Sequence, residues 1–405
     1  MFSLLSDRVS ALPTSATIAM NQKARELRAQ GHPVIDLSIG EPDFKTPQYI
    51  QTAAKQAIDT GRYFSYPPAA GYEDLRTAIA DKLRQENQIP CTPQQVVVSN
   101  GAKQSIANVL LCLLNPGDEV VVYSPHWVSY SSTIRLAGGT PVLLQGDVAD
   151  NFEPTPEQLD RAITPRTKAI IFSSPCNPTG HVLPRTSLQA IAAVLSKHPR
   201  VLAIADEIYE YINFTEVHTS LGALEGMQDR VVTINGVSKG FAMTGWRIGY
   251  MAAPLWLAQA CEKLQGQLTS APSSIAQRAA LAAIQGGREE VLAMVEAYRQ
   301  RRDLVLSLLE AIPGVRTPYP SGAFYVFPDV SDYWGFTNGD IVIQDAASLC
   351  MYLLQAAHVA LVPGDAFGSP NHIRLSYGTT TVQLQSAIKR IQIALARLRQ
   401  PKFTG

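Results

Sequence analysis

The sequence predicts an α/β protein in which a mostly parallel, seven-stranded sheet is flanked by helices and joined to a smaller α+β domain. Three observations support this fold class. Between residues 92 and 254, short β-branched runs alternate with longer helical patterns. These runs are almost continuously apolar, which is typical of strands that helices bury on both faces. After residue 285 the pattern changes to long amphipathic helices and a few short strand candidates.

The seven predicted strands follow one another through the alternating region. They are residues 95–99, 119–124, 141–145, 168–174, 201–206, 231–235 and 248–253. Between the first two strands, residues 106–113 place apolar side chains at i, i+3, i+4 and i+7, which predicts an amphipathic helix. The turn signal Asn115-Pro116-Gly117 predicts where this helix ends.

The C-terminal part of the chain predicts the smaller domain. It begins with a long amphipathic segment, 285–312, which bridges the two domains. Strand candidates and helical patterns follow at 322–327, 345–357, 359–363, 372–377 and 381–399. Residues 1–45 precede the alternating region, and we expect them to pack on the small domain. The expected division is therefore a large domain, 46–285, and a small domain made of residues 1–45 plus 286–405.

Composition and charge argue against several classes of protein. The 34 Lys and Arg residues balance 34 Asp and Glu residues, so neither nucleic acid nor an anionic membrane is the expected partner. No apolar run approaches the ~18 residues that a membrane-spanning helix needs. The N-terminus lacks a secretory pattern and the five cysteines are scattered, so we expect a cytoplasmic protein with free thiols. The seven histidines form no zinc-binding spacing, so no metal is expected.

The segment Ser99-Asn100-Gly101-Ala102-Lys103 lies between a predicted strand and a predicted helix. Free backbone N–H groups at a helix N-terminus favour an anion, and Gly101 would let a ligand approach closely. An ordinary βα turn also favours Asn-Gly. On its own, the segment is more typical of such a turn.

The segment 235–240 follows a later strand and supports two opposed interpretations. It contains G-x-S-x-G, the nucleophile pattern of serine hydrolases, and Asp365 and His372 could complete a triad with Ser238. It also contains Lys239, which could lose its proton in a desolvated turn and form a Schiff base with a carbonyl cofactor. A solvated surface lysine is the structural alternative.

Two further turns carry polar groups suited to a ring-shaped cofactor. At the end of the 201–206 strand, the Asp206 carboxylate could pair with a ring nitrogen and the Tyr209 phenol with a ring oxygen. A capping Asp beside a packed Tyr would give the same pattern. The turn 174–180 holds Asn177 between two prolines and a glycine, which could fix an amide for recognition or simply shape the turn.

These turns share one edge of the predicted sheet. Asn100, Trp127, Asn177, Asp206 and Lys239 each follow the carboxyl end of a separate predicted strand. An open parallel sheet binds its ligands at that edge. Their convergence favours a single ligand site over five unrelated turns.

With these residues in view, the sequence resembles the class I aminotransferases of fold type I, which depend on pyridoxal 5′-phosphate. The segment GVSKGFAMTGWRIG (236–249) matches the cofactor-lysine signature of that family without a break. Eight further segments occur in family order: SIGEPDF (38–44), YPPAAG (66–71), SNGAKQ (99–104), SPHWVSY (124–130), SPCNPTG (174–180), ADEIYE (205–210), SGAFYVF (321–327) and HIRLSYG (372–378). The likeness is strongest to the bacterial aspartate aminotransferase subgroup, including its N-terminal PTSAT (13–17).

The resemblance implies pyridoxal 5′-phosphate as the cofactor, with Lys239 forming the Schiff base and moving protons during catalysis. The ring would be held by Asp206 at its nitrogen, by Tyr209 and Asn177 at its hydroxyl oxygen, and by Trp127 on its face. The phosphate would be bound by Gly101, Ala102 and Arg247, and by Tyr66 of the neighbouring subunit. A homodimer is therefore expected.

The resemblance also implies a substrate site and a reaction. The substrate-binding residues would be Gly40, Trp127, Asn177 and Arg374, with Thr17 and Lys103 at the second carboxylate of a dicarboxylic substrate. Arg374 would clamp the α-carboxylate, because a planar fork suits a planar anion. The expected reaction is ping-pong transamination between aspartate and 2-oxoglutarate, which yields oxaloacetate and glutamate.

Other outcomes on the same fold stay open. They are transamination of aromatic amino acids, alanine or prephenate, a β-elimination lyase, and a catalytically silent binding protein; the serine hydrolase is a remote alternative. Family members that accept prephenate tend to carry a basic residue where this chain has Pro13, so we expect oxaloacetate to be preferred. Cys176 and His126 also depart from the family pattern, but the resemblance places neither against the cofactor.

Overall fold

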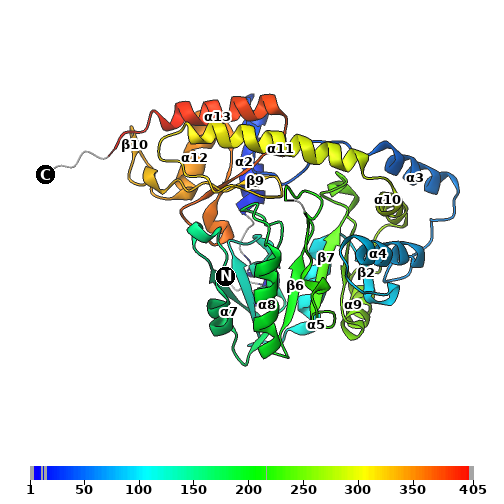
Figure 1. Ribbon diagram of the computed structural model, residues 1–405. Coiled ribbons are helices and arrows are strands. Elements are labelled where there is room, and N and C mark those ends of the chain that lie inside the picture. The colour runs from blue at the N-terminus through cyan, green and yellow to red at the C-terminus, as the bar shows by residue number, and fades with distance from the viewer. Residues whose placement is uncertain (1–3, 11, 13–15, 216, 401–405) are drawn as a thin grey trace.

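The computed structural model describes residues 4–10, 12, 16–215 and 217–400, apart from the side chains of residues 16 and 17. A seven-stranded sheet lies at the centre of the larger part of the molecule (Figure 1), in the order β2-β8-β7-β6-β5-β3-β4. Its strands are β2 (Val96–Ser99), β3 (Glu119–Ser124), β4 (Thr140–Gln145), β5 (Thr167–Ser173), β6 (Leu202–Asp206), β7 (Val231–Gly236) and β8 (Gly249–Ala252). The seven predicted strands are confirmed, each to within one residue at either end.

The sheet is mostly parallel, as predicted, and β8 is its single reversed strand. Strands β3 to β7 pair in parallel, whereas β8 pairs antiparallel with both β7 and β2. Six carboxyl ends therefore meet at one edge of the sheet, together with the amino end of β8. Gly249 begins β8 there, opposite Ser99 and Gly236 in the ladder.

Helices cover both faces of this sheet, which explains why its strands are apolar throughout. The helices are α3 (Gln48–Asp59), α4 (Glu73–Glu86), α5 (Ala102–Leu113), α6 (Ser129–Leu136), α7 (Pro156–Ala162), α8 (Arg185–Lys197), α9 (Leu255–Leu268) and α10 (Ser274–Gln285). Along β6, Ile204 joins one buried cluster with Val109 of α5. Its neighbour Ala203 points the other way, into a second cluster with Leu188 and Ile191 of α8. Successive residues thus face opposite layers.

The smaller part lies across the carboxyl edge of the sheet, and the long helix α11 (Glu289–Glu310) runs over both parts (Figure 1). Its main elements are α2 (Ala16–Ala29), β1 (Ile35–Asp36), β9 (Tyr325–Val326), α12 (Ala346–Ala357), β12 (Val359–Ala360), β13 (Val362–Pro363), β14 (Ile373–Ser376) and α13 (Thr381–Leu395). The N-terminal strand β1 pairs in parallel with β12, and β13-β14-β9 form an antiparallel sheet. This β1–β12 pairing places residues 35–36 on the smaller part.

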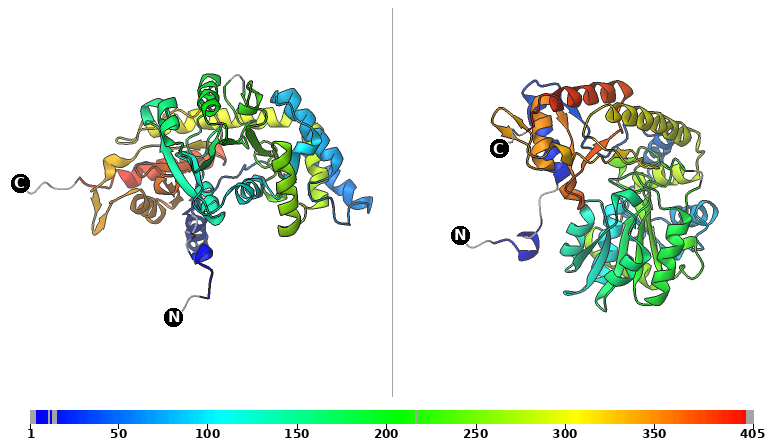
Figure 2. Two further views of the ribbon diagram at one scale, coloured as in Figure 1. Left: turned by 90° about the horizontal axis from the view of Figure 1, so that it is seen from below. Right: turned by 60° about the vertical axis from the view of Figure 1, so that its left-hand side comes forward.

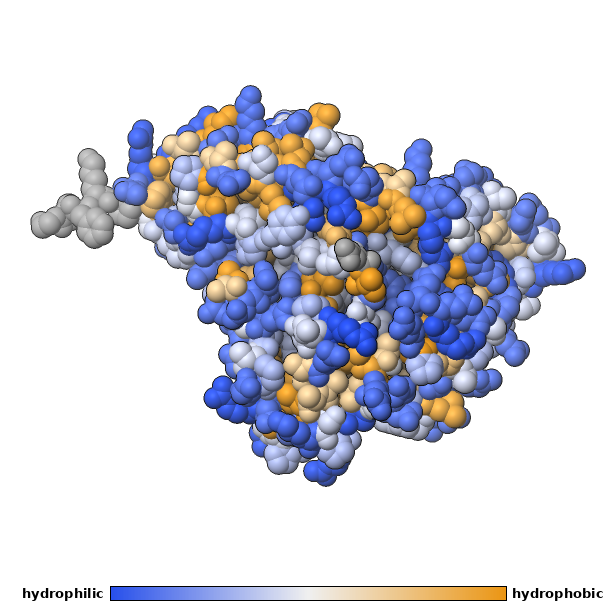
Figure 3. Space-filling model, viewed as in Figure 1, coloured by the Kyte–Doolittle hydropathy of each residue, from blue (hydrophilic) through white to orange (hydrophobic). Residues whose placement is uncertain are grey.

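The short helix α1 (Asp7–Ser10) stands away from the smaller part (Figure 2) and contacts α6 of the larger part. The face shown in Figure 3 is largely hydrophilic, with apolar side chains scattered over it. Within the described ranges, no helix combines the length and apolar character that a membrane span requires.

Candidate active site

The predicted site residues gather where the carboxyl edge of the sheet meets the smaller part. The larger part supplies Gly101 before α5, Trp127 after β3, Asn177 after β5, Asp206 at the end of β6 and Lys239 after β7. The smaller part supplies Arg374 from β14 and Gly40 from the segment after β1. The hydrogen bonds that join the parts in the site include those from Lys239 to Gly40 and from Arg374 to Asn177.

Lys239 points into the site and is not a solvated surface lysine. Its Nζ donates to the carbonyl oxygen of Gly40 at 2.5 Å and lies 5.9 Å from the ring centres of both Tyr209 and Phe324. Burial lowers the pKa of this ammonium to about 8, although the negative charge of Glu41 opposes the shift. An amine with such a pKa is partly unprotonated near neutral pH and can act as a nucleophile or base.

Asp206 is a buried carboxylate, 3% exposed, at the end of β6. The Tyr130 hydroxyl donates to its Oδ2 at 2.6 Å, and the backbone N–H of Ile208 donates to its Oδ1 at 3.3 Å. Burial raises its pKa to about 6 against these hydrogen bonds and the charge of Lys239. No Lys, Arg or His of the described residues forms an ion pair with it. The site therefore suits a ligand that brings a protonated nitrogen.

Arg374 is a buried guanidinium, 2% exposed, without a carboxylate partner among the described residues. Its Nη1 donates to Oδ1 of Asn177 at 2.9 Å and its Nη2 to the carbonyl oxygen of Ser38 at 2.6 Å, while its buried Nε has no hydrogen-bond partner in the described part of the chain. Its cation lies 4.6 Å from the ring centre of Tyr325 and 4.9 Å from that of Phe367. A buried, unpaired guanidinium is costly unless an anion completes the site, so this arrangement fits a substrate carboxylate.

The start of α5 and Arg247 form a cradle for a second anion. Gly101 adopts φ +79°, and a side chain there would place its Cβ 2.2 Å from Nη2 of Arg247. A Cβ on Gly249 would lie 2.1 Å from the backbone nitrogen of Ala102. Arg247 is exposed, and its Nη2 donates to the carbonyl oxygen of Asn100 at 3.3 Å. The N–H of Gly101 donates to the carbonyl oxygen of Ser99 at 2.7 Å, so it is the N–H groups that follow at the start of α5, beside the guanidinium, that suit a phosphate.

The residues predicted to bind the side chain of a substrate are only partly described. Nζ of Lys103 lies 5.0 Å from the ring centre of Trp127, and burial, followed by the charge of Arg247, lowers the Lys103 pKa. Thr17 lies in α2, but its side chain is outside the described residues, as is the whole of Pro13. The expected preference for oxaloacetate over prephenate therefore stays a prediction from the sequence.

Tyr66 stands apart from these groups. It is 95% exposed, so within one chain it does not reach the cradle formed by α5 and Arg247. Its predicted contact with a neighbouring subunit stays a prediction.

The serine hydrolase interpretation is wrong, because its triad is not assembled. Nδ1 of His372 lies 2.9 Å from Oγ of Ser369, and its buried Nε2 has no hydrogen-bond partner among the residues that the structure describes. The ring stacks on Phe327 with centres 4.8 Å apart. Neither nitrogen of His372 therefore bonds Ser238, and the G-x-S-x-G match is an overlap of patterns.

Sequence reasoning missed two tyrosines that complete the site. Tyr130 bonds Asp206, and the hydroxyl groups of Tyr325 and Tyr209 lie 2.7 Å apart. Both lie in segments that carry the family resemblance, SPHWVSY and SGAFYVF. Their place in these two segments was the signal that could have identified them. Nothing in the sequence indicated which residue either tyrosine contacts.

Comparison with known proteins decides the family of this site. The profile of the family described as aminotransferase class I and II matches residues 32–391. The chain belongs to this family. A bifunctional aspartate aminotransferase and glutamate/aspartate-prephenate aminotransferase of Petunia hybrida is 47% identical to it, over 98% of this chain and 84% of the relative.

Solved structures agree with this assignment. The aspartate aminotransferase of Rhizobium meliloti gives a TM-score of 0.95 at 37% identity, covering 98% of this chain and 100% of that one. The aspartate aminotransferase of Thermus thermophilus with maleate gives 0.90 at 42% identity, covering 97% and 100%. The fold type I aminotransferase-like architecture predicted from the sequence is thereby confirmed.

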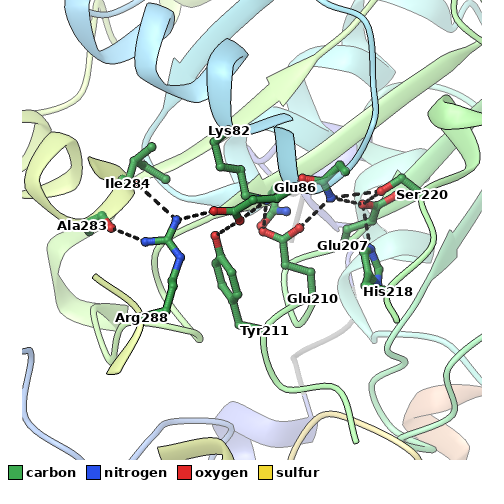
Figure 4. Close-up of polar contacts among 12 residues, drawn as sticks. Lys82, Glu86, Glu207, Glu210, Tyr211, His218, Ser220, Ala283, Ile284 and Arg288 are labelled. Carbon is green, nitrogen blue, oxygen red and sulfur yellow. Dashed lines mark hydrogen bonds and ion pairs between the residues drawn. The ribbon is translucent and has the colours of Figure 1, made fainter. Parts of the chain in front are cut away.

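The residues that follow Asp206 in the chain, Glu207 and Glu210, belong to a buried polar network (Figure 4). Glu210 forms an ion pair with Lys82, whose Nζ also donates to Oδ1 of Asn87 at 2.7 Å. The Asn87 amide in turn donates to Glu210 at 2.8 Å. Each buried charge thus has a partner, as the low-dielectric interior requires.

The second half of this network surrounds Glu207. Its Oε2 accepts a hydrogen bond from Oγ of Ser220 at 2.6 Å and lies 3.0 Å from Nε2 of His218 (Figure 4). Glu207, Glu210 and His218 place potential metal-ligand atoms within 4.8 Å of one another. Lys82 already supplies a cation there, so the arrangement is accounted for without a metal.

The His218–Glu207 pair predicts a pH-dependent stability. Burial alone would lower the pKa of His218, but the charge of Glu207 and its hydrogen bond to the ring raise the pKa above its usual value. A histidine whose pKa is raised in the folded state contributes its full stabilisation at pH values below the pKa of the unfolded state. This contribution to the free energy of unfolding is lost as the pH rises through the pKa of the folded state. His218→Gln should therefore cost ~1.5–3 kcal/mol at pH 6 and clearly less at pH 9.

Denaturant unfolding at both pH values measures this difference. The exposed His32 offers a matched control, because His32→Gln should leave the free energy of unfolding nearly unchanged at either pH. An equal loss for His218→Gln at pH 6 and pH 9 would contradict the charged pair.

Proposed function

We propose that this aminotransferase binds pyridoxal 5′-phosphate at the carboxyl edge of its sheet and transfers the amino group between aspartate and 2-oxoglutarate. One observation carries the proposal. Asp206 and Arg374 are buried charged groups beside Lys239, and neither has an ion-pair partner among the described residues. A cofactor with a basic ring nitrogen and a carboxylate substrate would supply both missing partners.

The residues of the site fit this cofactor. Asp206 would hold a proton on the ring nitrogen, and the first turn of α5 with Arg247 would hold the phosphate. Tyr209 and Asn177 would bond the ring hydroxyl oxygen, and Trp127 would stack on the ring. When bound, pyridoxal phosphate takes up the amino group and serves as the electron sink at the α-carbon of the substrate.

The chain's own groups then account for orientation and proton movement. Arg374 orients the substrate through its α-carboxylate with N–H groups that buried partners hold in place. The carbonyl of Gly40 lies against Nζ of Lys239 at 2.5 Å and marks where this amine is held. With a pKa of about 8, Nζ of Lys239 can take up and return a proton near neutral pH.

Aspartate as the substrate rests on the relatives and on Lys103. The Petunia relative carries aspartate, glutamate and prephenate in its name, and the Thermus structure was solved with maleate, a dicarboxylate. Lys103 would bring a positive charge to the second carboxylate, with Thr17 beside it. Prephenate is the second candidate oxo acid, because the names of the Petunia relative and of several bacterial relatives include it.

Replacing Lys103 with Ala should lower kcat/KM for aspartate on the order of 10–150-fold, because a hydrogen bond to a charged group contributes ~1.5–3 kcal/mol. The kcat/KM for alanine and for phenylalanine should fall little, because the side chains of these substrates do not contact Lys103. The exposed Lys55 in α3 offers a control, and Lys55→Ala should change none of the three. Equal losses on all three amino acids would show that Lys103 only shapes the cofactor site.

We also propose a cytoplasmic homodimer as the active unit, with domains 46–285 and 1–45 plus 286–405 in each subunit. Tyr66 at 95% exposure and Phe64 at 71% lie on one loop and would be covered by a partner. The cysteines of the described residues are free thiols, which suits a reducing compartment.

A single-turnover screen tests the proposed function. The cofactor-loaded protein is mixed with one amino acid at a time and no oxo acid, and the visible absorption is followed. Aspartate and glutamate should convert the bound cofactor faster than alanine or phenylalanine. Conversion by alanine or phenylalanine but not by aspartate would overturn the proposed substrate.

A further inference from the structure

We infer that Tyr325 is a positioning residue whose hydroxyl donates a hydrogen bond to Tyr209 and thereby strengthens the bond that Tyr209 makes to the ring oxygen of the cofactor. The inference deepens the proposed function and rests on it. It starts from the 2.7 Å contact between the two buried hydroxyl groups.

The strand register explains how Tyr325 reaches the site. In the antiparallel pair of β14 and β9, Tyr325 lies opposite Ser376, two residues beyond Arg374. Residues two apart on a strand share one face, so Arg374 and Tyr325 are diagonal neighbours. Their contact follows, with the guanidinium carbon 4.6 Å from the ring centre.

The ring of Tyr325 is held from several sides. Arg374 covers one face, and the rings of Tyr209 and Phe324 pack at centre distances of 5.8 Å and 4.9 Å. A Cβ on Gly40 would lie 2.2 Å from the Tyr325 hydroxyl, so glycine is required for this close approach. The hydroxyl is therefore fixed against Tyr209 rather than free to turn towards solvent.

The direction of the hydrogen bond follows from counting protons. Either hydroxyl could be the donor in this pair. A phenol has one proton, so once Tyr209 donates to the ring oxygen it can only accept from Tyr325. A hydroxyl that accepts a hydrogen bond becomes a stronger donor through polarisation. Tyr325 would thus favour the negative charge on the ring oxygen without touching it.

The pH dependence of the bound cofactor's visible absorption measures this effect directly. Hydrogen bonds to the ring oxygen favour the form of the cofactor that has lost a proton, so removing one should raise the pH midpoint. Tyr325→Phe keeps the ring under Arg374 and removes only the hydroxyl. We expect its midpoint to rise by about 0.3–1 pH unit, in line with the loss of one hydrogen bond.

Tyr298 provides a matched control in the same aromatic cluster. Within the described ranges its buried hydroxyl has no hydrogen-bond partner, and its ring centre lies 5.3 Å from that of Phe324. Tyr298→Phe should leave the midpoint unchanged. A shift in Tyr298→Phe equal to that in Tyr325→Phe would mean that any change in this cluster moves the midpoint, and would overturn the inference.

A cycle with Tyr209 separates this inference from the proposed function. Tyr209→Phe should raise the midpoint more than Tyr325→Phe, and the double variant should show no shift beyond Tyr209→Phe. If Tyr209→Phe shifts the midpoint but Tyr325→Phe does not, the inference is wrong and the proposed function stands. If the wild-type protein gains no visible band with pyridoxal phosphate, the proposed function itself fails.

Discussion

Replacing Lys239 with Ala should abolish transamination while the protein still folds and binds pyridoxal phosphate. The cradle of Gly101, Ala102 and Arg247 does not depend on the lysine, and neither does Asp206. General acid–base catalysis alone contributes about 10²–10⁴-fold, and loss of the attacking amine adds to that. We therefore expect turnover at least ~10⁴-fold below wild type.

Lys239→Arg is the informative partner variant. Arginine keeps the positive charge but does not lose its proton in proteins, so this variant should be as inactive as Lys239→Ala. Steady-state turnover and equilibrium dialysis of the cofactor measure the two properties separately. Near-normal turnover in either variant would remove Lys239 from its proposed role.

The second large effect is expected for Asp206→Asn. An amide cannot hold a proton on the ring nitrogen as a carboxylate does, so the electron sink weakens. Losing a group that stabilises charge in the transition state typically costs about 10²–10³-fold, and we expect the single-turnover rate with aspartate to fall by at least that much. An unchanged rate would exclude Asp206 as the ring-nitrogen partner.

The same substitution should stabilise the protein without its cofactor. Burial raises the pKa of Asp206 to about 6, so stability is lost as the pH rises from the unfolded value near 4 through 6. At pH 8 cofactor-free Asp206→Asn should therefore unfold at higher denaturant than the wild type, whereas at pH 4 the two should be similar. Such a gain would mark Asp206 as a residue kept for function at the expense of stability.

The sequence predicted the sheet well because the strands are buried on both faces. Short, continuously apolar and β-branched runs such as EVVVYS are typical of buried strands. The structure places this run in β3, with the same first and last residues as predicted. The runs carry no information about direction. The reversal of β8 therefore appeared only with the observed pairing.

The site could be predicted where a motif carried its own chemistry, and where the family resemblance assigned a role, as it did for Arg374. Lys239, Asp206 and Asn177 stand in turns whose composition is unusual enough to indicate a role. Tyr130 and Tyr325 do not, because their partners lie 76 and 116 residues away along the chain. Such contacts depend on packing between elements, which no local pattern records.

The buried network of Glu207 and Glu210 shows the same limit. Glu210 is part of ADEIYE, yet its partner Lys82 lies 128 residues away in α4. From the sequence alone, Lys82 would be expected on the solvated face of a helix, because lysines are almost never buried unless they are paired.

Transfer of a nitrogen label tests the central claim most directly. The cofactor-loaded protein is incubated with L-[¹⁵N]aspartate and 2-oxoglutarate, and the products are followed by NMR and mass spectrometry. The account predicts [¹⁵N]glutamate and oxaloacetate in equal amounts, and neither product with Lys239→Ala. Release of the label as ammonia, or the absence of labelled glutamate, would contradict amino-group transfer between these two acids.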